Sequence, residues 1–448
     1  MVSNYTTHNQ LLTVIMRNTS FLRFLICSAK QFWTASHLGV ALLLVSPMVS
    51  AQGVVSGSPV VRLGEQVSYQ YLATYDVAKL RGVLGSGLDQ FMASSAYPYQ
   101  ALRARMKPPR YAVHLYKVTY DSKIPEAGGI PVRGSGLLAL PATDALLLPL
   151  VSYQHGTVFE RDSVPASVAN SFETQLMLAV FASQGYAVIA SDYLGLGDST
   201  VPNTYGAPQA SVQASLDMLQ ASRAVLTSKG RSVSHLFVHG WSQGGYNTLA
   251  LLRSLEMKGE KVAAASTAAA PTDVRLWVDR LMNNPQASDA PWLVAAGSNL
   301  LMAVDTYSLP GLAERAIRPE FRELARKFYA FEIGFAEFFS KVPHQFKDYL
   351  QPEFLANANF GEGDFWKGLD RSENYRWRVS TPLRNYYGEA DEVVPTAIAR
   401  LPEQVGQILG SQTQAISAGP KSDHRGAYLY SLAHVPAWYA SFMPVKPR

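Results

Sequence analysis

Ser242 has a glycine two residues away on either side, in the segment Gly240-Trp241-Ser242-Gln243-Gly244. An apolar run typical of a buried strand precedes the segment, and a run typical of a helix follows it. A serine in such a strand-to-helix turn is exposed at the end of the strand, beside free N–H groups that can stabilise negative charge. Glycines suit positions 240 and 244, because side chains there would strike the neighbouring strand or helix. We therefore predict that Ser242 is a catalytic nucleophile; an ordinary tight turn is the alternative.

A serine hydroxyl is a poor nucleophile until a base takes its proton, and a carboxylate must orient that base. For a nucleophile in this kind of turn, the carboxylate and then the histidine follow the serine along the chain. Asp391 meets this requirement, because it lies in the loop directly after a predicted strand, in the segment YYGEADEVVP. We favour it over its neighbour Glu392, which is expected to point elsewhere, and over an ordinary surface turn.

Two histidines lie beyond the predicted acid. His424 falls in the loop between the last predicted strand and the last predicted helix, whereas His434 falls inside that helix. A base must reach over the serine from a loop, so we predict that His424 is the base and that His434 packs within the helix. Asp423 is expected to cap the final helix and not to act as the acid.

Two N–H groups should stabilise the oxyanion that forms when a serine attacks a carbonyl carbon. One is the backbone N–H of Gln243, directly after the nucleophile, and the other should come from the loop after the first long parallel strand. This loop reads YQHGTVFERDSVP, and its glycine lets the backbone come close to a ligand. We predict that the N–H of Thr157 is the second donor, and that His155 is a structural histidine bonding its own loop.

The pattern of apolar segments predicts the scaffold that carries these residues. Two early strands, 113–122 and 134–142, flank a glycine-rich turn and should pair antiparallel. Beyond them, short apolar strands alternate with helix-length segments, which is typical of an α/β protein with a mostly parallel sheet and helices on both faces. The later predicted strands are 148–155, 186–191, 235–240, 262–270, 383–388 and 414–419, and the predicted helices are 170–185, 209–230, 243–259, 396–410 and 425–442.

The alternation stops between residues 271 and 380. This segment contains 18 aromatic residues, about 16% of its length, against 11% in the whole chain, and helical stretches such as 321–342. We predict an inserted helical cap over the carboxyl ends of the strands; a helical subdomain without a role in the site is the alternative.

The first 51 residues differ from the rest in charge. They hold Arg17, Arg23 and Lys30, no acidic residue, and an apolar stretch that ends in small residues up to Ala51. This pattern predicts a signal peptide cleaved after Ala51. Translation that starts at Met16 would give a leader of more usual length, and an uncleaved anchor is the alternative.

Composition then excludes several classes of function. The chain has 448 residues, of which 48% are hydrophobic and 16% charged, which indicates a globular protein. Its net charge of +5 falls to +2 without the leader, so charge gives no reason to expect a nucleic-acid partner. The only cysteine, Cys27, also lies in the leader, which leaves no disulfide, thiolate metal site or cysteine nucleophile. The histidines show no metal-ligand spacing, and we expect no metal or cofactor.

With these motifs in this order, the chain resembles the α/β-hydrolase superfamily over about residues 110–445. The segments YQHGTVFERDSVP, ETQLMLAVFASQGYAVIASDYLGLGDS, HGWSQGG and GEADEVVP look like those of bacterial relatives of the secretory lipases and esterases, a group that includes fungal lipase A. The resemblance implies a hydrolase core at 111–270 and 381–448, a helical cap at 271–380 and a triad of Ser242, Asp391 and His424. Residues 52–110, a lead-in with a helix expected near Asp76, match no core element. The loop 191–199 is expected either near the mouth of the site or as a turn that packs the end of the sheet.

The resulting hypothesis is an exported enzyme, secreted or periplasmic, that cleaves carboxylic esters through an acyl-enzyme intermediate. The aromatic cap favours an apolar small-molecule or lipid-like substrate, and no stable membrane anchor is expected after signal cleavage. An exopeptidase or amidase of the prolyl-oligopeptidase-like branch is one alternative, although 59 lead-in residues are too few for the β-propeller usual in that branch. A non-catalytic binding protein of the same fold is another, and the oligomeric state stays open.

Overall fold

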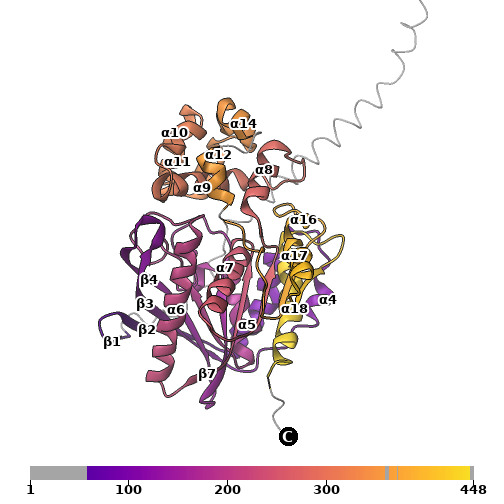
Figure 1. Ribbon diagram of the computed structural model, residues 1–448. Helices are drawn as coiled ribbons and strands as arrows, with labels where there is room; N and C mark the ends of the chain where they lie inside the picture. Colours follow the sequence, from indigo (N-terminus) through magenta and orange to yellow (C-terminus); the bar gives the residue numbers. More distant parts are fainter. Residues whose placement is uncertain (1–57, 359–362, 371, 444–448) are drawn as a thin grey trace, which may run out of the picture. The chain divides into compact units, whose positions relative to one another are not determined.

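Ten strands form one mixed sheet in the computed structural model, which describes residues 58–358, 363–370 and 372–443 (Figure 1). The spatial order is β1-β2-β3-β4-β6-β5-β7-β8-β9-β10, in which the pairs from β1 to β6 are antiparallel and those from β6 to β10 are parallel. The predicted α/β class with a mostly parallel sheet is thereby confirmed. The strands are β1 (Val60–Leu63), β2 (Val67–Tyr75), β3 (Val113–Ile124), β4 (Ile130–Pro141), β5 (Leu147–Gln154), β6 (Ala187–Ser191), β7 (Ser232–Trp241), β8 (Val262–Ala268), β9 (Leu383–Tyr387) and β10 (Thr413–Ser417). The predicted signal peptide, its cleavage site and Cys27 lie outside the described residues.

The predicted antiparallel pair at the start of the core is confirmed. β3 and β4 pair over their full length, from Val113 opposite Pro141 to Ile124 opposite Ile130. Gly128 and Gly129, in the turn between them, have φ values of 71° and 83°, a backbone conformation that favours glycine. The glycines in the sequence therefore fix the place of this turn.

The lead-in contains two strands that the sequence did not reveal. β2 pairs antiparallel with β3, and β1 pairs with β2, so the segment extends the antiparallel edge of the sheet. Most of β2 is partly exposed on both sides, so it lacks the alternation of buried and exposed residues that signals a strand. The helix expected near Asp76 is confirmed: α2 (Val77–Gly82) begins after this residue, whose carboxylate accepts the N–H of Lys79 at 2.7 Å. The short helices α3 (Leu88–Phe91) and α4 (Gln100–Arg103) follow.

Helices cover both faces of the parallel half of the sheet, which explains its continuous apolar strands. Val151 and Phe237 point to one face and pack in the same core as residues of α5 and α18. Their strand neighbours Leu150 and Val238 point to the other face and pack with residues of α6 and α7. The helices are α5 (Phe172–Val180), α6 (Pro208–Ser228), α7 (Gln243–Met257) and α18 (His424–Ala440).

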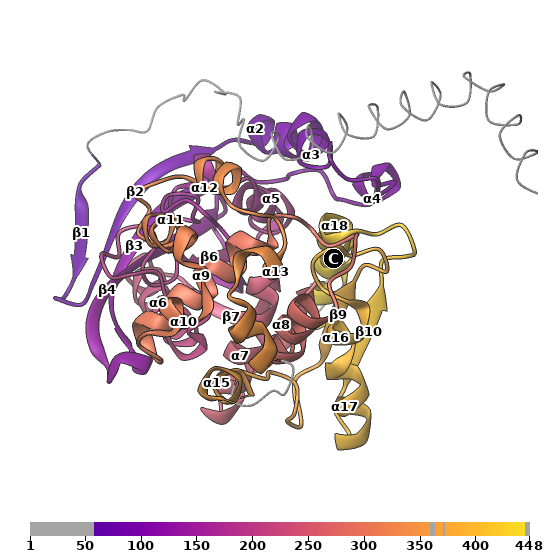
Figure 2. The same cartoon turned by 90° about the horizontal axis from the view of Figure 1, so that it is seen from above.

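Between β8 and β9, the described residues form helices and no strand. These inserted helices group together at one end of the sheet, and Figure 2 views them from above. The predicted helix 321–342 is in fact two helices, separated where Phe331 adopts a positive φ of 59°. The predicted helix 396–410 is likewise two, α16 (Thr396–Ala399) and α17 (Leu401–Leu409), with Pro402 in the first turn of α17. The inserted helices are α8 (Val274–Asn283), α9 (Leu293–Tyr307), α10 (Leu312–Ala316), α11 (Pro319–Tyr329), α12 (Phe335–Lys341), α13 (Phe346–Tyr349), α14 (Pro352–Ala358) and α15 (Asp364–Asp370).

Candidate active site

Ser242 occupies the strand-to-helix turn that the sequence predicted, between the last residue of β7 and the first of α7. Its φ of 58° is unusual for a residue with a side chain, and such backbone strain is common at functional turns. A Cβ atom at Gly240 would lie 2.2 Å from the carbonyl oxygen of Gly244, and one at Gly244 would lie 1.9 Å from that of Gln154. Both glycines are therefore required by the close approach of strand and helix, as expected.

The structure brings Asp391 and His424 together. Asp391 follows β9, and its two carboxylate oxygens both lie 3.0 Å from Nδ1 of His424. Only 1% of the Asp391 side chain and 5% of the His424 side chain are exposed. The carboxylate is held in place because it also accepts the N–H groups of Val393 and Val394 at 2.8 and 2.9 Å. His424 is the first residue of α18, not a loop residue as predicted, and Asp423 caps this helix by accepting the N–H of Gly426, as expected.

The charges around His424 favour its protonated form. Burial opposes the charge, but the carboxylates of Asp391, Glu392 and Asp423 outweigh burial and raise the pKa of the imidazole above its usual value. Glu392 does not face the ring, because its carboxylate accepts the backbone N–H of His424 at 3.1 Å. The two neighbouring acids therefore differ in what they contact, and Asp391 is the one that faces the imidazole.

Trp241 links the serine turn to the histidine. Its indole N–H donates to the carbonyl oxygen of His424 at 3.2 Å, and its ring centre lies 5.2 Å from that of the imidazole. The same indole stacks on Tyr428, one turn further along α18, with 4.6 Å between ring centres. The residue before Ser242 thus packs directly against the element that carries His424.

His155 makes the local bonds that the sequence suggested. Its Nδ1 donates to the carbonyl oxygen of Gly156 at 2.8 Å, and its Nε2 lies 3.3 Å from the backbone oxygen of Asp192. The carboxylate of Asp192 bonds elsewhere, to Ser135 Oγ at 2.6 Å and the N–H of Ala166 at 2.8 Å. Burial lowers the pKa of His155 to about 4, so the ring is neutral at physiological pH. Among the described residues the ring bonds to backbone oxygens and to no carboxylate, which fits the structural role expected for His155. His434 bonds within its helix, to the carbonyl oxygen of Tyr430.

The loop 191–199 packs the end of the sheet. Tyr193 stacks on His155 with 4.2 Å between ring centres, and a Cβ atom at Gly195 would lie 2.4 Å from the backbone of Asn203. Tyr193 also donates to the carbonyl oxygen of His155 at 3.2 Å. Of the two expectations for this loop, the packing turn fits these contacts.

A small apolar cavity of about 60 Å³ lies at Ser242. Gln243 and Thr157, the predicted oxyanion donors, both line it beside the serine. The insertion and the loop after β9 supply its apolar wall, with Trp277, Trp292, Ala296, Leu300, Val393 and Val394. The cavity therefore joins the predicted nucleophile to the inserted helices.

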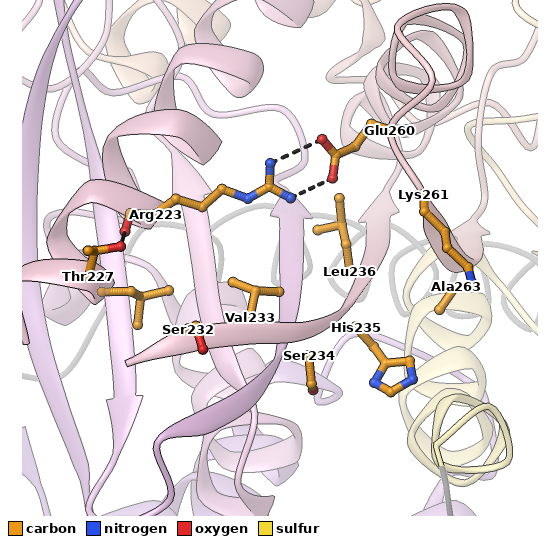
Figure 3. A pocket seen from close by; sticks show the side chains of 11 residues that line it. Arg223, Thr227, Ser232, Val233, Ser234, His235, Leu236, Glu260, Lys261 and Ala263 are labelled. Atoms are coloured by element: carbon orange, nitrogen blue, oxygen red, sulfur yellow. Dashed lines mark hydrogen bonds and ion pairs between the residues drawn. The ribbon is translucent and has the colours of Figure 1, made fainter. Parts of the chain in front are cut away.

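A larger cavity of about 510 Å³ lies elsewhere, where α6 meets the first residues of β7 and β8 (Figure 3). Arg223 and Glu260 form a two-bond ion pair in it, with N–O distances of 2.6 and 3.1 Å. None of the predicted site residues lines this cavity. Volume alone would select the wrong place for the chemistry.

No motif or spacing in the sequence points to Glu173, which lies beside the site. Its carboxylate accepts the N–H of Gly156 at 2.8 Å and the hydroxyl of Tyr153. Burial raises the pKa of Glu173 to about 7, although these hydrogen bonds and the nearby His424 act in the opposite direction. An acidic residue in the first turn of a helix is ordinarily explained by the helix dipole, so nothing in the sequence separated it from a capping residue.

In the described part of the chain, no group of three or more His, Cys, Asp or Glu side chains could hold a metal ion. Nor does any helix there combine the length and apolar character needed to cross a bilayer.

The chain is similar in sequence and in fold to known proteins. Residues 163–254, which include the serine turn, match the sequence model of the family described as Secretory lipase. No curated protein matches the chain. A structure from Legionella pneumophila is 22% identical, with a TM-score of 0.74, and the match covers 87% of this chain and 99% of that one.

Two further similar structures have described activities. The rice cell wall degrading esterase LipA from Xanthomonas oryzae is 21% identical over 85% of this chain and 96% of its own, with a TM-score of 0.69. Candida antarctica lipase A is 16% identical over 75% of this chain and 79% of its own, with a TM-score of 0.60. At these identities the structures show the fold alone, and the match to the lipase family covers residues 163–254. The chain therefore has the α/β-hydrolase fold of these structures, and its residues 163–254 are similar to the secretory lipase family.

Proposed function

We propose that the chain cleaves esters with Ser242 as the nucleophile, His424 as the base and Asp391 as the acid that orients the base. The observation that carries this proposal is the buried imidazole, whose Nδ1 lies 3.0 Å from both oxygens of a carboxylate, on a helix packed against the serine turn. Because Nδ1–H donates to Asp391, Nε2 is left free to take the serine proton.

The reaction then runs in two halves. Ser242 Oγ bonds to the carbonyl carbon of the ester as His424 takes its proton, and the C–O bond to the alcohol breaks as His424 returns that proton to the leaving oxygen. Water next gives a proton to His424 and bonds to the acyl carbon; the bond from that carbon to Ser242 Oγ then breaks as His424 returns the proton to Oγ, which releases the acid and regenerates the serine. The N–H groups of Gln243 and Thr157, which line the cavity beside Ser242, stabilise the oxyanion in both halves.

The substrate we propose has an apolar acyl or aryl part. The cavity wall is formed by tryptophan and aliphatic side chains, and residues 271–380 act as a cap that supplies much of it. A volume of about 60 Å³ is far below the roughly 300 Å³ of pockets that enclose a small molecule. Substrate entry therefore requires that cap residues move.

The cavity favours ester cleavage over removal of amino-terminal residues from peptides. An exopeptidase would need an acidic side chain to bind the substrate's ammonium group, and among the described residues that line the cavity there is no Asp or Glu. We further propose that the protein is exported to the periplasm or the medium, on the basis of its amino-terminal leader and its secretory lipase match. Protein collected outside the cytoplasm should then begin at Gln52, which amino-terminal sequencing tests.

The decisive experiment compares wild type with Ser242→Ala. Wild type should hydrolyse p-nitrophenyl esters but not aminoacyl anilides, and a fluorophosphonate probe should label it. The variant should lose both turnover and labelling while it keeps its melting temperature. Turnover in the variant would refute the assigned nucleophile, and labelling without any ester turnover by wild type would refute the proposed substrate class.

A further inference from the structure

Glu173 has no role in the mechanism above, yet its carboxylate lies at the loop that carries a proposed oxyanion donor. One oxygen, Oε1, accepts two hydrogen bonds: from the N–H of Gly156 at 2.8 Å and from the hydroxyl of Tyr153. Tyr153 lies on β5, and Gly156 lies in the loop that follows it. The bond to Gly156 therefore ties the backbone of this loop to the start of α5.

This bond fixes one of the two peptide groups that set the direction of the Thr157 N–H. The carbonyl oxygen of Gly156 and the N–H of Thr157 belong to the same planar trans peptide group, so they point in opposite directions. His155 Nδ1 holds that carbonyl oxygen at 2.8 Å, while Glu173 holds the N–H of the preceding peptide group. With both sides of Gly156 held, the N–H of Thr157 is directed away from the His155 ring.

The same carboxylate connects the loop to the other parts of the site. The hydroxyl of Tyr153 lies 3.2 Å from that of Tyr428, which in turn lies 3.4 Å from the backbone oxygen of Glu173. Tyr428 stacks on Trp241, whose indole N–H bonds the backbone of His424. Contacts of Glu173, Tyr428 and Trp241 thus connect three parts of the site: the loop after β5, the turn that carries Ser242, and helix α18, which begins at His424.

We infer that Glu173 is a positioning residue, which aligns the Thr157 N–H with the oxyanion by accepting the N–H of Gly156. This inference rests on the proposed function, because the donor it aligns is the one assigned there. An oxyanion donor acts on the transition state more than on the bound substrate. Loss of its alignment therefore lowers kcat and leaves KM nearly unchanged.

Three variants separate alignment from general damage to the fold. Glu173→Met keeps the length of the side chain but removes the acceptor, and we expect kcat for a p-nitrophenyl ester to fall about 10- to 100-fold, with KM changed less than about threefold. Glu173→Gln keeps an oxygen that can accept both bonds, so it should keep kcat within about fivefold of wild type. Glu173→Asp, which shortens the side chain by one methylene, should lie between them and serves if the methionine variant does not fold.

A trifluoromethyl ketone supplies a readout that a purely structural role would not change. This inhibitor adds to a serine hydroxyl and places an oxyanion where the transition state has one, so its affinity follows transition-state stabilisation. Across the variants, its inhibition constant should rise by the same factor by which kcat/KM falls. Fluorophosphonate titration of Ser242 normalises each value to the fraction of active enzyme.

The inference is overturned if Glu173→Met or Glu173→Asp keeps the wild-type kcat per titrated serine, or if inhibitor affinity does not follow kcat/KM. It is also overturned if Glu173→Gln loses as much activity as Glu173→Met, because the charge and not the hydrogen bond would then matter. Each of these three results leaves the proposed function intact as long as Ser242→Ala is inactive. Turnover by Ser242→Ala would instead remove the proposed function itself.

Discussion

Replacement of Asp391 by asparagine tests the proposed base most directly. The asparagine oxygen can still accept the N–H groups of Val393 and Val394, so the loop after β9 should keep its shape. The second carboxylate oxygen becomes an NH₂ group, and the negative charge beside His424 is lost. The variant therefore removes the electrostatic support of the imidazole with little change in volume.

The expected loss of kcat/KM in Asp391→Asn follows from the distance between His424 and Asp391. As the serine proton is transferred, His424 becomes positively charged with its Nδ1 atom 3.0 Å from the Asp391 oxygens, in a site where both side chains are at least 95% buried. Two opposite charges about 3–4 Å apart at an effective dielectric constant of about 20 attract each other by about 4–6 kcal/mol. This energy corresponds to a fall in kcat/KM of about 10³- to 10⁴-fold, since each 1.36 kcal/mol is about a factor of ten.

The pH dependence of kcat/KM is a second, independent test of the roles assigned to His424 and Asp391. Only the neutral imidazole can act as the base, so activity should fall as the pH drops through the pKa of His424, which nearby carboxylates raise. Asp391→Asn removes the carboxylate that faces the ring, so the acid limb of kcat/KM should move to lower pH. Glu392→Gln is the matched control, because Glu392 contacts the backbone of His424 and not its ring; we expect a loss below about tenfold. Hydrolysis by Asp391→Asn at more than a tenth of the wild-type rate, or an unmoved acid limb, would refute the assignment.

Three further predictions concern the turn, the cavity and metals. Gly244→Ala places a methyl group 1.9 Å from the backbone oxygen of Gln154 and should destabilise the fold by about 3 kcal/mol or more. The control is Gly368→Ala, which has open space around it and should not lower the melting temperature. Equal melting temperatures of the two variants would contradict the close approach of Gly244 to Gln154. Leu300→Ala removes the side chain that faces Gly206 in the cavity, so longer acyl esters should be preferred. We expect kcat/KM for these esters to rise about fourfold for each methylene newly buried. An unchanged dependence of kcat/KM on acyl length would show that Leu300 does not limit the cavity. EDTA should leave kcat/KM unchanged, since no metal-ligand cluster lies among the described residues, and a loss restored by added metal would contradict this.

Much of the fold could be predicted because most strands and helices are marked by a pattern within their own short stretch of sequence. Each strand of the parallel half is a short apolar run, and the serine turn needs glycines on both sides, so these elements are visible in the sequence. β1 and β2 were missed because β2 lies partly exposed on both faces and has no periodic pattern. The break at Phe331 was missed because a positive φ at a phenylalanine is imposed by packing and has no sequence signal.

The sequence by itself determined which residue types could do the chemistry and in what order they come: a serine in a tight turn, then an acid after a strand, then a histidine before a helix. The tertiary structure decided which side chains meet. Asp391 and Glu392 are adjacent in the chain, and only the packing of β9 against α18 turns one carboxylate to the imidazole and the other to the backbone. Glu173 likewise looks like a helix-capping residue until the fold sets it against Gly156. Local patterns record how each segment folds, but contacts between distant segments depend on how the sheet and helices pack, and this is why the tertiary structure was needed to find them.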